Sequence, residues 1–301
     1  MRRAGRRAAA PVLALALGLA GAGTAPLFAQ TGTAPARPPE RIVSINLCTD
    51  QILLDLVPRE RIRAISHLAS DRSVSALYDR VAGIAATRGE AEAVLALDPD
   101  LVLAGAYSTP ATVAVLERLG RRVEKVPAAQ DIEGIKAVVR RVAEAVGERE
   151  RGEAVVGAFE RWLAEAVGDT GGSESAKRPS ALVYQVNNIA SGSGNLADNV
   201  LAAAGFTNHA VHLGLGAGGK LALESLIASP PDLLVLTGPV DEYRTVTADN
   251  LRHPALARLR AERATVTVPW RFWLCGTPYV AEAVRRLVEA RKALIERRAA
   301  R

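Results

Sequence analysis

The sequence predicts an α/β protein made of two pseudo-symmetric lobes, each with a central parallel sheet, joined by a rigid long helical connector. Three observations support this prediction. Strand-like and helix-like runs alternate along the chain, a purely helical segment interrupts them near the middle, and one short motif occurs twice. With 301 residues, 49% of them hydrophobic, the chain is long enough to form two modest cores.

The first 29 residues have the three-part order of a cleaved export signal. Four arginines in the first seven positions precede an apolar run from residue 8 to residue 20, which is too short to anchor the chain in a bilayer. Small residues follow, and we expect cleavage after Ala29, with Ala22 as the alternative. No cysteine follows the run, so we expect no lipid anchor and no stable membrane insertion. The proline-containing residues 30–39 then form a flexible leader, and we expect the mature protein to be exported.

The charge balance gives little reason to expect an acidic partner. The formal net charge is +6, but the four arginines of the signal contribute most of it. Without them, 34 basic residues face 32 acidic ones, and both signs are dispersed along the chain. A balance this close to neutral is too weak for a nucleic-acid-binding surface. We therefore expect no nucleic-acid partner.

Strand-like and helix-like runs alternate from residue 40 to residue 128, the expected first lobe. The strand-like runs are residues 42–45, 62–65, 101–103 and 123–126, and the helix-like runs are residues 49–57, 91–97 and 111–119. The alternation returns within residues 171–301, the expected second lobe. Its strand-like runs are residues 181–186, 233–236 and 265–268, with helices at 195–204 and from about Tyr279 onward. This order is typical of βα units around a parallel sheet.

The segment between the lobes, residues 129–170, has helical periodicity throughout. Apolar residues follow one helical stripe up to Gly147 and a second stripe after it, and Asp131 suits the N-cap position of the first helix. A polar loop over residues 171–175 precedes the second lobe. A helical connector of this kind predicts a stiff spine rather than a flexible hinge.

One motif occurs in both lobes. Each copy has a glutamate that opens a short helix, a proline seven residues later, an aspartate and then a buried strand. The glutamates are Glu92 and Glu224, and the Pro-Asp pairs are Pro99-Asp100 and Pro231-Asp232. We interpret the Pro-Asp pairs as an economical connection between helix and strand. The simplest interpretation of the glutamates is a favourable charge in the first turn of a helix.

Five segments taken together carry a resemblance to a known family. They are RIVSINLCTDQILLDL (41–56), EAVLALDPDLVLA (92–104), DIEGIKAVVRRVAEAVGERERGEA (131–154), GSGNLADNVLAAAGFTN (192–208) and ESLIASPPDLLVL (224–236). In this order they resemble the periplasmic binding proteins for cobalamin and ferric siderophores. The likeness extends from about residue 40 to the C-terminal helix.

The resemblance implies a function as well as a fold. It implies two lobes joined by a rigid helix, a ligand cleft between them, and no catalysis. The partner would be the inner-membrane permease dimer of an ABC importer with its ATPase subunits. In the family each lobe offers a glutamate to arginines of the permease, and Glu92 and Glu224 occupy the matching positions. We expect a monomer that carries no resident cofactor or metal.

Ligands of α/β lobes bind beyond the carboxyl ends of the strands. This rule selects nine candidate ligand-binding residues: Asn46, Cys48, His67, Tyr107, Gln185, Asn187, Trp270, Trp273 and Cys275. Aromatic residues make up 4% of the chain, yet three of them occupy positions 270–273. Aromatic faces with a few amides suit a large, partly apolar chelate. The alternative is that these aromatic residues fill the core beside the last strand.

The expected ligand is a metal chelate, and a cobalamin-type corrinoid fits best because it is bulky and largely neutral. A ferric siderophore and heme are the alternatives. Arg271 is the main cationic candidate in the cleft loops, and one arginine argues against a strongly anionic catecholate.

The two cysteines allow two interpretations. We expect Cys48 and Cys275 at the cleft, one on each lobe, as ligand-contacting thiols. The alternative is a disulfide, which is usual in an exported protein with two cysteines. That bond needs Cα atoms within about 7 Å of each other, and a cleft that admits a bulky chelate would hold them further apart.

Other classes of function have weaker support. His209 and His212 are three residues apart, but their surroundings predict a loop with no cluster of further metal ligands. The glycine-rich residues 214–219 do not follow a predicted strand and are expected to be a flexible connection. The glycines beside Ser193 lack the spacing of a nucleophile elbow. A secreted hydrolase or a scaffold protein is therefore less favoured than a binding protein.

Overall fold

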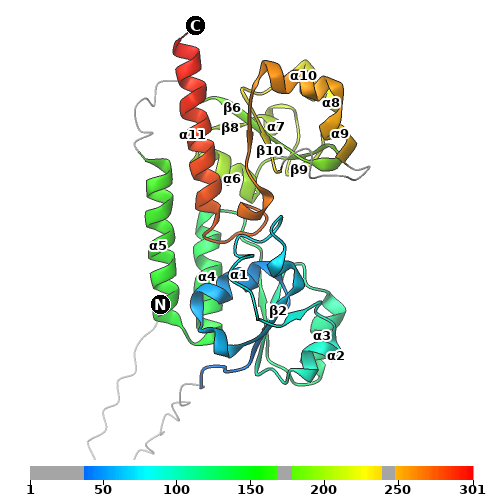
Figure 1. Cartoon of the computed structure of the whole chain (residues 1–301), viewed down its shortest axis with the longest axis vertical. Coiled ribbons are helices and arrows are strands. Elements are labelled where there is room, and N and C mark those ends of the chain that lie inside the picture. Colours follow the sequence, from blue (N-terminus) through cyan, green and yellow to red (C-terminus); the bar gives the residue numbers. More distant parts are fainter. Residues whose placement is uncertain (1–36, 169–177, 239–247, 301) are drawn as a thin grey trace, which may run out of the picture. The chain divides into compact units, whose positions relative to one another are not determined.

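The computed structural model describes residues 37–168, 178–238 and 248–300, which form two α/β lobes (Figure 1). The expected signal peptide, most of the expected leader and the polar loop over residues 171–175 lie outside the described residues. Within the described part, no helix is both long enough and apolar enough to cross a membrane.

The first lobe is built on a five-stranded parallel sheet with the order β3-β2-β1-β4-β5. The strands are β1 (Ile42–Ser44), β2 (Ile62–Ser66), β3 (Ala86–Thr87), β4 (Leu101–Gly105) and β5 (Val123–Val126). The helices are α1 (Leu47–Leu56), α2 (Ala91–Ala96) and α3 (Pro110–Arg118), with 3₁₀ turns η1 (Arg59–Arg61) and η2 (His67–Ser70). The predicted βα units and parallel sheet are confirmed here.

The second lobe has a mixed sheet with the order β11-β10-β6-β7-β9, and β8 also pairs with β6. The strands are β6 (Ser180–Tyr184), β7 (Ile189–Ser191), β8 (Thr207–Asn208), β9 (Gly218–Lys220), β10 (Leu233–Leu236) and β11 (Ala264–Thr267). The helices are α6 (Leu196–Ala203), α7 (His209–His212), α8 (Leu223–Ala228), α9 (Asp249–Arg252), α10 (Pro254–Glu262) and α11 (Val280–Ala299), with 3₁₀ turns η3 (Val186–Asn188) and η6 (Trp270–Phe272). Strands β6, β8, β10 and β11 run parallel, whereas β7 is antiparallel to β6 and β9.

Two local predictions in the second lobe are wrong. Part of the expected flexible connection is strand β9, which the backbone of β7 holds in register. The glycines allow the two backbones to approach closely, because a Cβ added at Gly192 would lie 2.1 Å from the carbonyl oxygen of Gly216. His209 and His212 lie on the short helix α7 rather than in a loop.

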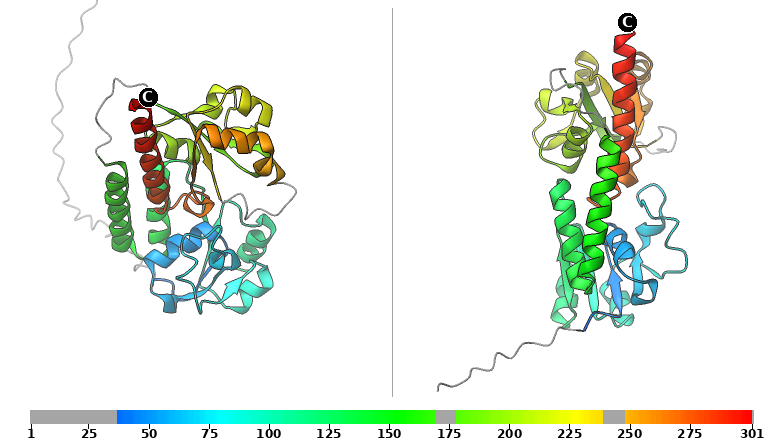
Figure 2. Two further views of the ribbon diagram at one scale, coloured as in Figure 1. Left: turned by 45° about the horizontal axis from the view of Figure 1, so that its top comes forward. Right: turned by 90° about the vertical axis from the view of Figure 1, so that its left-hand side faces the viewer.

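The connector consists of helices α4 (Ile132–Val146) and α5 (Arg149–Val167), which lie side by side (Figure 1). The Asp131 side chain caps α4 by accepting the N–H of Gly134, and Gly147 ends the helix with a φ of 77°. Gly152 of α5 touches α4 so closely that an added Cβ would lie 2.4 Å from the Ala143 Cβ. Helix α11 packs along α5, as both views in Figure 2 show. The predicted stiff spine is therefore a helical pair braced by the C-terminal helix.

The repeated motif has the same structural role in both lobes. The Asp100 carboxylate, just before β4, accepts the N–H groups of Glu40 and Arg41 at 2.9 Å each, at the start of the neighbouring strand β1. The Asp232 carboxylate, just before β10, accepts the N–H of Ser180 at 2.8 Å, at the start of the neighbouring strand β6. Each aspartate therefore joins the starts of two adjacent parallel strands.

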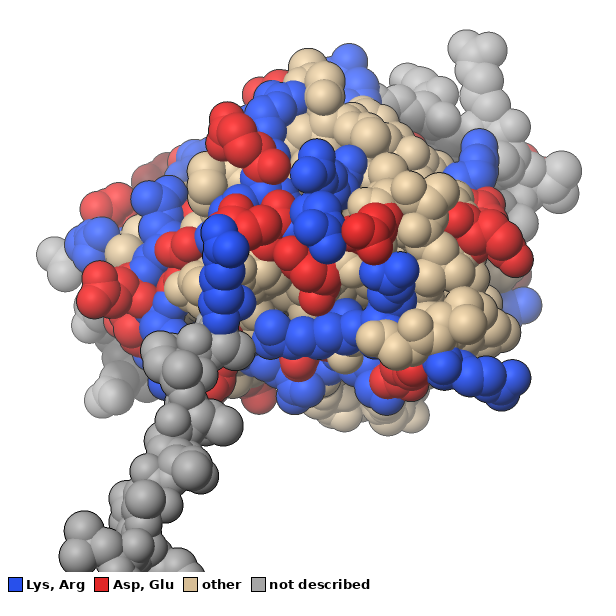
Figure 3. Space-filling view, turned by 90° about the horizontal axis from the view of Figure 1, so that it is seen from below, with Lys and Arg blue, Asp and Glu red and all other residues tan. Residues whose placement is uncertain are grey.

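The surface carries both signs of charge in close alternation. The view from below in Figure 3 shows lysine and arginine interspersed with aspartate and glutamate. Asp98, for example, pairs with both Arg41 and Arg121. Mixed pairs of this kind produce no extended field of one sign.

Candidate functional site

A cavity of about 300 Å³ lies between the lobes, and both lobes contribute to its wall. The first lobe supplies Asn46, Cys48, Thr49, Ile52, Gly105, Ala106, Tyr107 and Val126. The stretch leading into α4 and α4 itself supply Pro127, Ala128, Ala129, Gln130 and Val138. The second lobe supplies Ser191, Asn195, Leu196, Ala197, Trp270, Trp273, Leu274 and Gly276.

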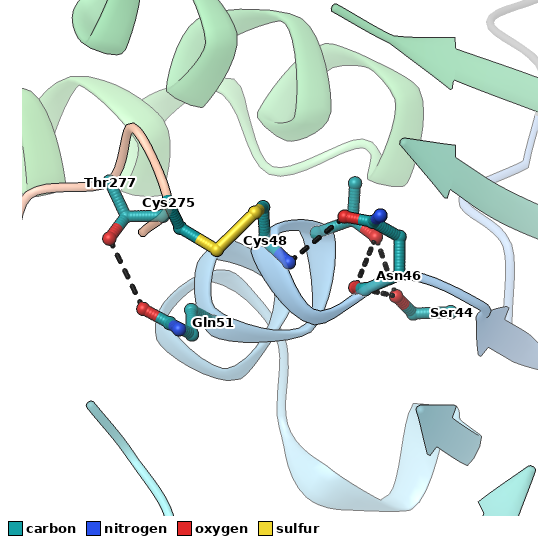
Figure 4. Close-up of a disulfide and its surroundings, with 7 residues drawn as sticks. Ser44, Asn46, Cys48, Gln51, Cys275 and Thr277 are labelled. Atoms are coloured by element: carbon teal, nitrogen blue, oxygen red, sulfur yellow. Dashed lines mark hydrogen bonds between the residues drawn. A yellow bond between two sulfur atoms is a disulfide. The ribbon is translucent and has the colours of Figure 1, made fainter. Parts of the chain in front are cut away.

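Asn46 is held in place by helix α1 and by β4. It is the N-cap of α1, where its Oδ1 accepts the N–H of Cys48 at 2.9 Å (Figure 4). A Cβ added at Gly105, the last residue of β4, would lie 2.3 Å from the Asn46 Cγ. Only glycine leaves room for the amide there. Since Oδ1 is used by the cap, the Nδ2 donor of Asn46 is the group left for a ligand.

The two tryptophans of the second lobe lie at the 3₁₀ turn η6 that follows β11, Trp270 as its first residue and Trp273 directly after its end. The Trp270 N–H donates to the carbonyl oxygen of Thr237 at 2.7 Å, which fixes the turn against the sheet. Trp270 is half-buried and Trp273 is 4% exposed, and both line the cavity. Phe272, between them, packs instead against the guanidinium groups of Arg271 and Arg286, at 4.8 and 5.4 Å from its ring centre.

No charged side chain is among the described residues that line the cavity. The polar lining groups are amides and hydroxyls, and the amide of Asn195 is already committed to the Asp198 N–H and the Ala217 carbonyl. Arg271, the cationic candidate from the sequence, donates to the carbonyl oxygen of Arg72 at 3.2 Å and is not part of the lining. The cavity is therefore suited to an uncharged surface with hydrogen-bonding groups at its edge.

The structure divides the residues selected from the sequence into two groups. Asn46, Cys48, Tyr107, Trp270 and Trp273 line the cavity. The remaining four, His67, Gln185, Asn187 and Cys275, are not among the lining residues.

The reasons for this division are local. His67 starts the exposed turn η2. The Gln185 side-chain amide donates to Ser191 Oγ at 3.2 Å, and the Gln185 backbone carbonyl oxygen accepts the side-chain amide N–H of Asn250. Asn187 is exposed, in a left-handed conformation with a φ of 59°.

Sequence reasoning missed four polar lining residues: Thr49, Gln130, Ser191 and Asn195. Ser191 lies on β7, which is antiparallel, so the rule of parallel strand ends does not apply to it. Asn195 is the N-cap of α6, and its position before an apolar helical run was a usable signal.

The prediction of two free thiols is wrong, because Cys48 and Cys275 form a disulfide with a Cα–Cα distance of 5.2 Å (Figure 4). Close to this point the second lobe meets the start of the connector, since a Cβ added at Gly276 would lie 2.5 Å from the Ala129 Cβ. Cys275 is 2% exposed and is not among the residues that line the cavity.

Of the two neighbouring histidines, His209 has a structural contact. His209 is buried, and its Nε2 lies 2.8 Å from the carbonyl oxygen of Ser229. Among the described residues, no group of three or more histidine, cysteine, aspartate or glutamate side chains is arranged to hold a metal ion.

Comparison with known proteins agrees with this architecture. Residues 42–266 match the family described as periplasmic binding protein. The chain belongs to this family. Similar proteins include the cobalamin-binding proteins of two strains of Halobacterium salinarum, 25% identical over 218 residues. The match covers 72% of this chain and 58% of each relative, so the chain spans just over half of their length.

Solved structures of periplasmic binding proteins share the fold. The periplasmic heme-binding protein RhuT from Roseiflexus sp. RS-1, in apo form, has a TM-score of 0.70 and 24% identity, covering 85% of this chain and 98% of that one. The periplasmic vitamin B12 binding protein BtuF of Vibrio cholerae has a TM-score of 0.65 and 16% identity, with the same coverage of 85% and 98%. At these identities the likeness establishes the fold.

Proposed function

We propose that this chain is the non-enzymatic, periplasmic substrate-binding component of an ABC importer, and that it captures a corrinoid in the cavity between its lobes. The observation that carries the proposal is the lining: two indole side chains and neutral polar groups, without a charged side chain among the described lining residues. A corrinoid presents a broad ring face with uncharged amides around its edge. Heme carries two propionates, and catecholate siderophores are strongly anionic, so either would favour a cationic partner at the site.

The size of the cavity defines how such a ligand would sit. A corrinoid is larger than about 300 Å³, so the cavity receives one side of the ring and the remainder extends into solvent. Trp270 and Trp273 offer apolar surface to the ring, and the free Asn46 Nδ2 donates to an amide oxygen at its edge. The similarity to proteins named as cobalamin-binding supports the same choice.

Calorimetric titration with cobinamide, cobalamin, heme and a ferric catecholate tests the ligand. We expect micromolar or tighter binding of a corrinoid and weaker binding of the anionic chelates. Replacing Trp270 with alanine should weaken corrinoid binding about tenfold, since a buried aromatic contact contributes about 0.5–1.5 kcal/mol beyond its area. The matched control is Trp162→Phe, on α5 and outside the cavity lining. Binding of heme or the catecholate with no binding of either corrinoid would refute the proposal.

We further propose that Glu92 and Glu224 dock the permease. Both are exposed, and both lie in the first turn of a short helix, α2 or α8. They occupy equivalent places in the repeated motif, so a symmetric permease dimer would present one basic pocket to each of them. Charges at the rim of an interface mainly steer association and fix its register.

Charge reversal at both positions tests the docking proposal. Glu92→Lys/Glu224→Lys should abolish uptake through like-charge repulsion while chelate binding stays normal. The control is Glu150→Lys/Glu165→Lys, which reverses two exposed glutamates on α5 and should leave uptake intact. If the glutamates only stabilise their helices, the effect is about 0.3–1 kcal/mol of stability with normal transport, and that result would end the docking assignment.

A further inference from the structure

A short segment of the second lobe lies along helix α1 of the first lobe and contacts it at three places. Cys275 is bonded to Cys48, the Thr277 hydroxyl lies 3.2 Å from Gln51 Oε1, and the Tyr279 hydroxyl donates to Asp55 Oδ2 at 2.7 Å. Figure 4 shows the first two of these contacts next to each other. We call the three contacts together the latch.

The spacing of the latch residues follows from helix geometry. Cys48, Gln51 and Asp55 are spaced i, i+3 and i+7, so they lie on one face of α1. Their partners are Cys275, Thr277 and Tyr279, which are every second residue of one segment. One face of the helix therefore meets one side of the segment over two helical turns.

The latch is sealed from solvent over most of its length. Cys275 is 2% exposed, and Gln51 and Thr277 are 1% exposed each. At the outer end, Arg80 donates to Asp55 at 2.8 Å and to the Tyr279 hydroxyl at 3.3 Å. Burial and the charge of Asp55 raise the pKa of Tyr279, so the phenol stays protonated and keeps donating to the carboxylate.

The disulfide end of the latch is part of the cavity wall. Cys48 lines the cavity, and so do Trp273, Leu274 and Gly276 on either side of Cys275. Gly276 is also in tight contact with Ala129, another lining residue, so the second lobe packs directly against the start of the connector there.

We infer that the latch fixes the two lobes against each other along α1, with the disulfide as its covalent member, so that this wall of the cavity is formed before the ligand arrives and stays closed when it leaves. Ligand exchange then uses the wall that contains Tyr107, which is 84% exposed. A preformed wall spares the ligand the entropy of ordering it, so an intact latch raises affinity. The effect on affinity rests on the proposed function, whereas the effect on lobe motion does not.

Hydrogen–deuterium exchange of the ligand-free protein tests the latch directly. The samples are the oxidised protein, the protein reduced with a trialkylphosphine, and Cys48→Ser/Cys275→Ser. In the reduction the phosphine takes oxygen from water and becomes the phosphine oxide, and the two sulfurs take the two protons. We expect exchange in residues 269–279 and in the first turns of α1 to be at least about tenfold faster without the bond. Exchange in α2 and β10 should be unchanged. Tyr279→Phe, which keeps the disulfide, should have a smaller effect.

Two exchange outcomes would overturn the inference. Equal exchange in all three samples would mean that the bond restrains nothing, and faster exchange throughout both lobes would mean that it maintains the fold rather than this wall.

Cobinamide titration of the same samples tests the link to affinity. We expect binding to weaken about 5- to 150-fold when the disulfide is absent, the usual range for coupled equilibria. Equal affinities despite faster exchange would refute the role of the latch in binding. If the oxidised protein binds no corrinoid at all, the proposed function fails, while the exchange result still decides the latch.

Discussion

The absence of a side chain at Gly105 leaves room for the amide of Asn46. Asn46 faces the cavity because its Oδ1 caps α1, and Gly105 leaves the space that its amide occupies. The sequence identified Asn46 because the residue follows a predicted strand. It did not identify Gly105, because the need for glycine arises from contact between β4 and the start of α1, which are far apart in sequence.

Gly105→Ala should destabilise the protein by about 1–3 kcal/mol, since an extra carbon must displace the Asn46 amide or the strand. The displaced amide should also weaken ligand binding. Gly216→Ala is the control, because an added Cβ there meets nothing within 4 Å. Urea unfolding and calorimetric titration measure the two effects. A Gly105→Ala protein as stable as the control would contradict the argument.

At the scale of elements, the repeated motif links a helix to the following strand and also joins that strand to its neighbour in the sheet. Asp100 and Asp232 occupy equivalent positions: at the start of the neighbouring strand, Asp100 accepts two N–H groups and Asp232 accepts one. Partial burial disfavours ionisation of Asp232, but the groups of Ser180 and the nearby Arg298 outweigh it and lower the pKa of Asp232. The aspartate of the motif therefore stabilises the sheet, while the glutamate is exposed at the surface.

The lowered pKa of Asp232 gives a pH dependence of known sign. Its stabilising contribution is fully present above the unfolded pKa of about 3.9 and is lost as the pH falls below that value. Asp232→Asn should lower stability at pH 7 by about 1 kcal/mol, a charge-assisted hydrogen bond discounted for partial exposure. The difference from the unmodified protein should shrink as the pH falls from about 3.9 through the lowered pKa of Asp232, as urea titrations at several pH values would reveal. A difference that is constant with pH would contradict the assignment.

At the scale of the whole molecule, local sequence signals predicted the elements but not every contact between them. The parallel strands and the two-helix connector were predictable because hydrophobic periodicity, Asp131 and Gly147 are local signals. Strand β9 was not predictable, because its glycines pair through the backbone and have no strand propensity. The disulfide depends on how closely the lobes approach, which no local pattern reports. The rule that ligands bind beyond the ends of parallel strands identified Asn46 and Tyr107. It does not apply to antiparallel β7, so Ser191 was missed.

The bond between Cys48 and Cys275 also changes how the chain would carry mechanical force. The two cysteines are 227 positions apart, so the bond closes a covalent ring that contains β2 to β11 and the connector. Only β1, the residues before it and α11 with the residues around it lie in the tails outside the ring. Tension applied between the two ends of the chain would pass from one tail to the other through the sulfur atoms. The backbone between the two cysteines would then lie outside the shortest covalent path from one end to the other.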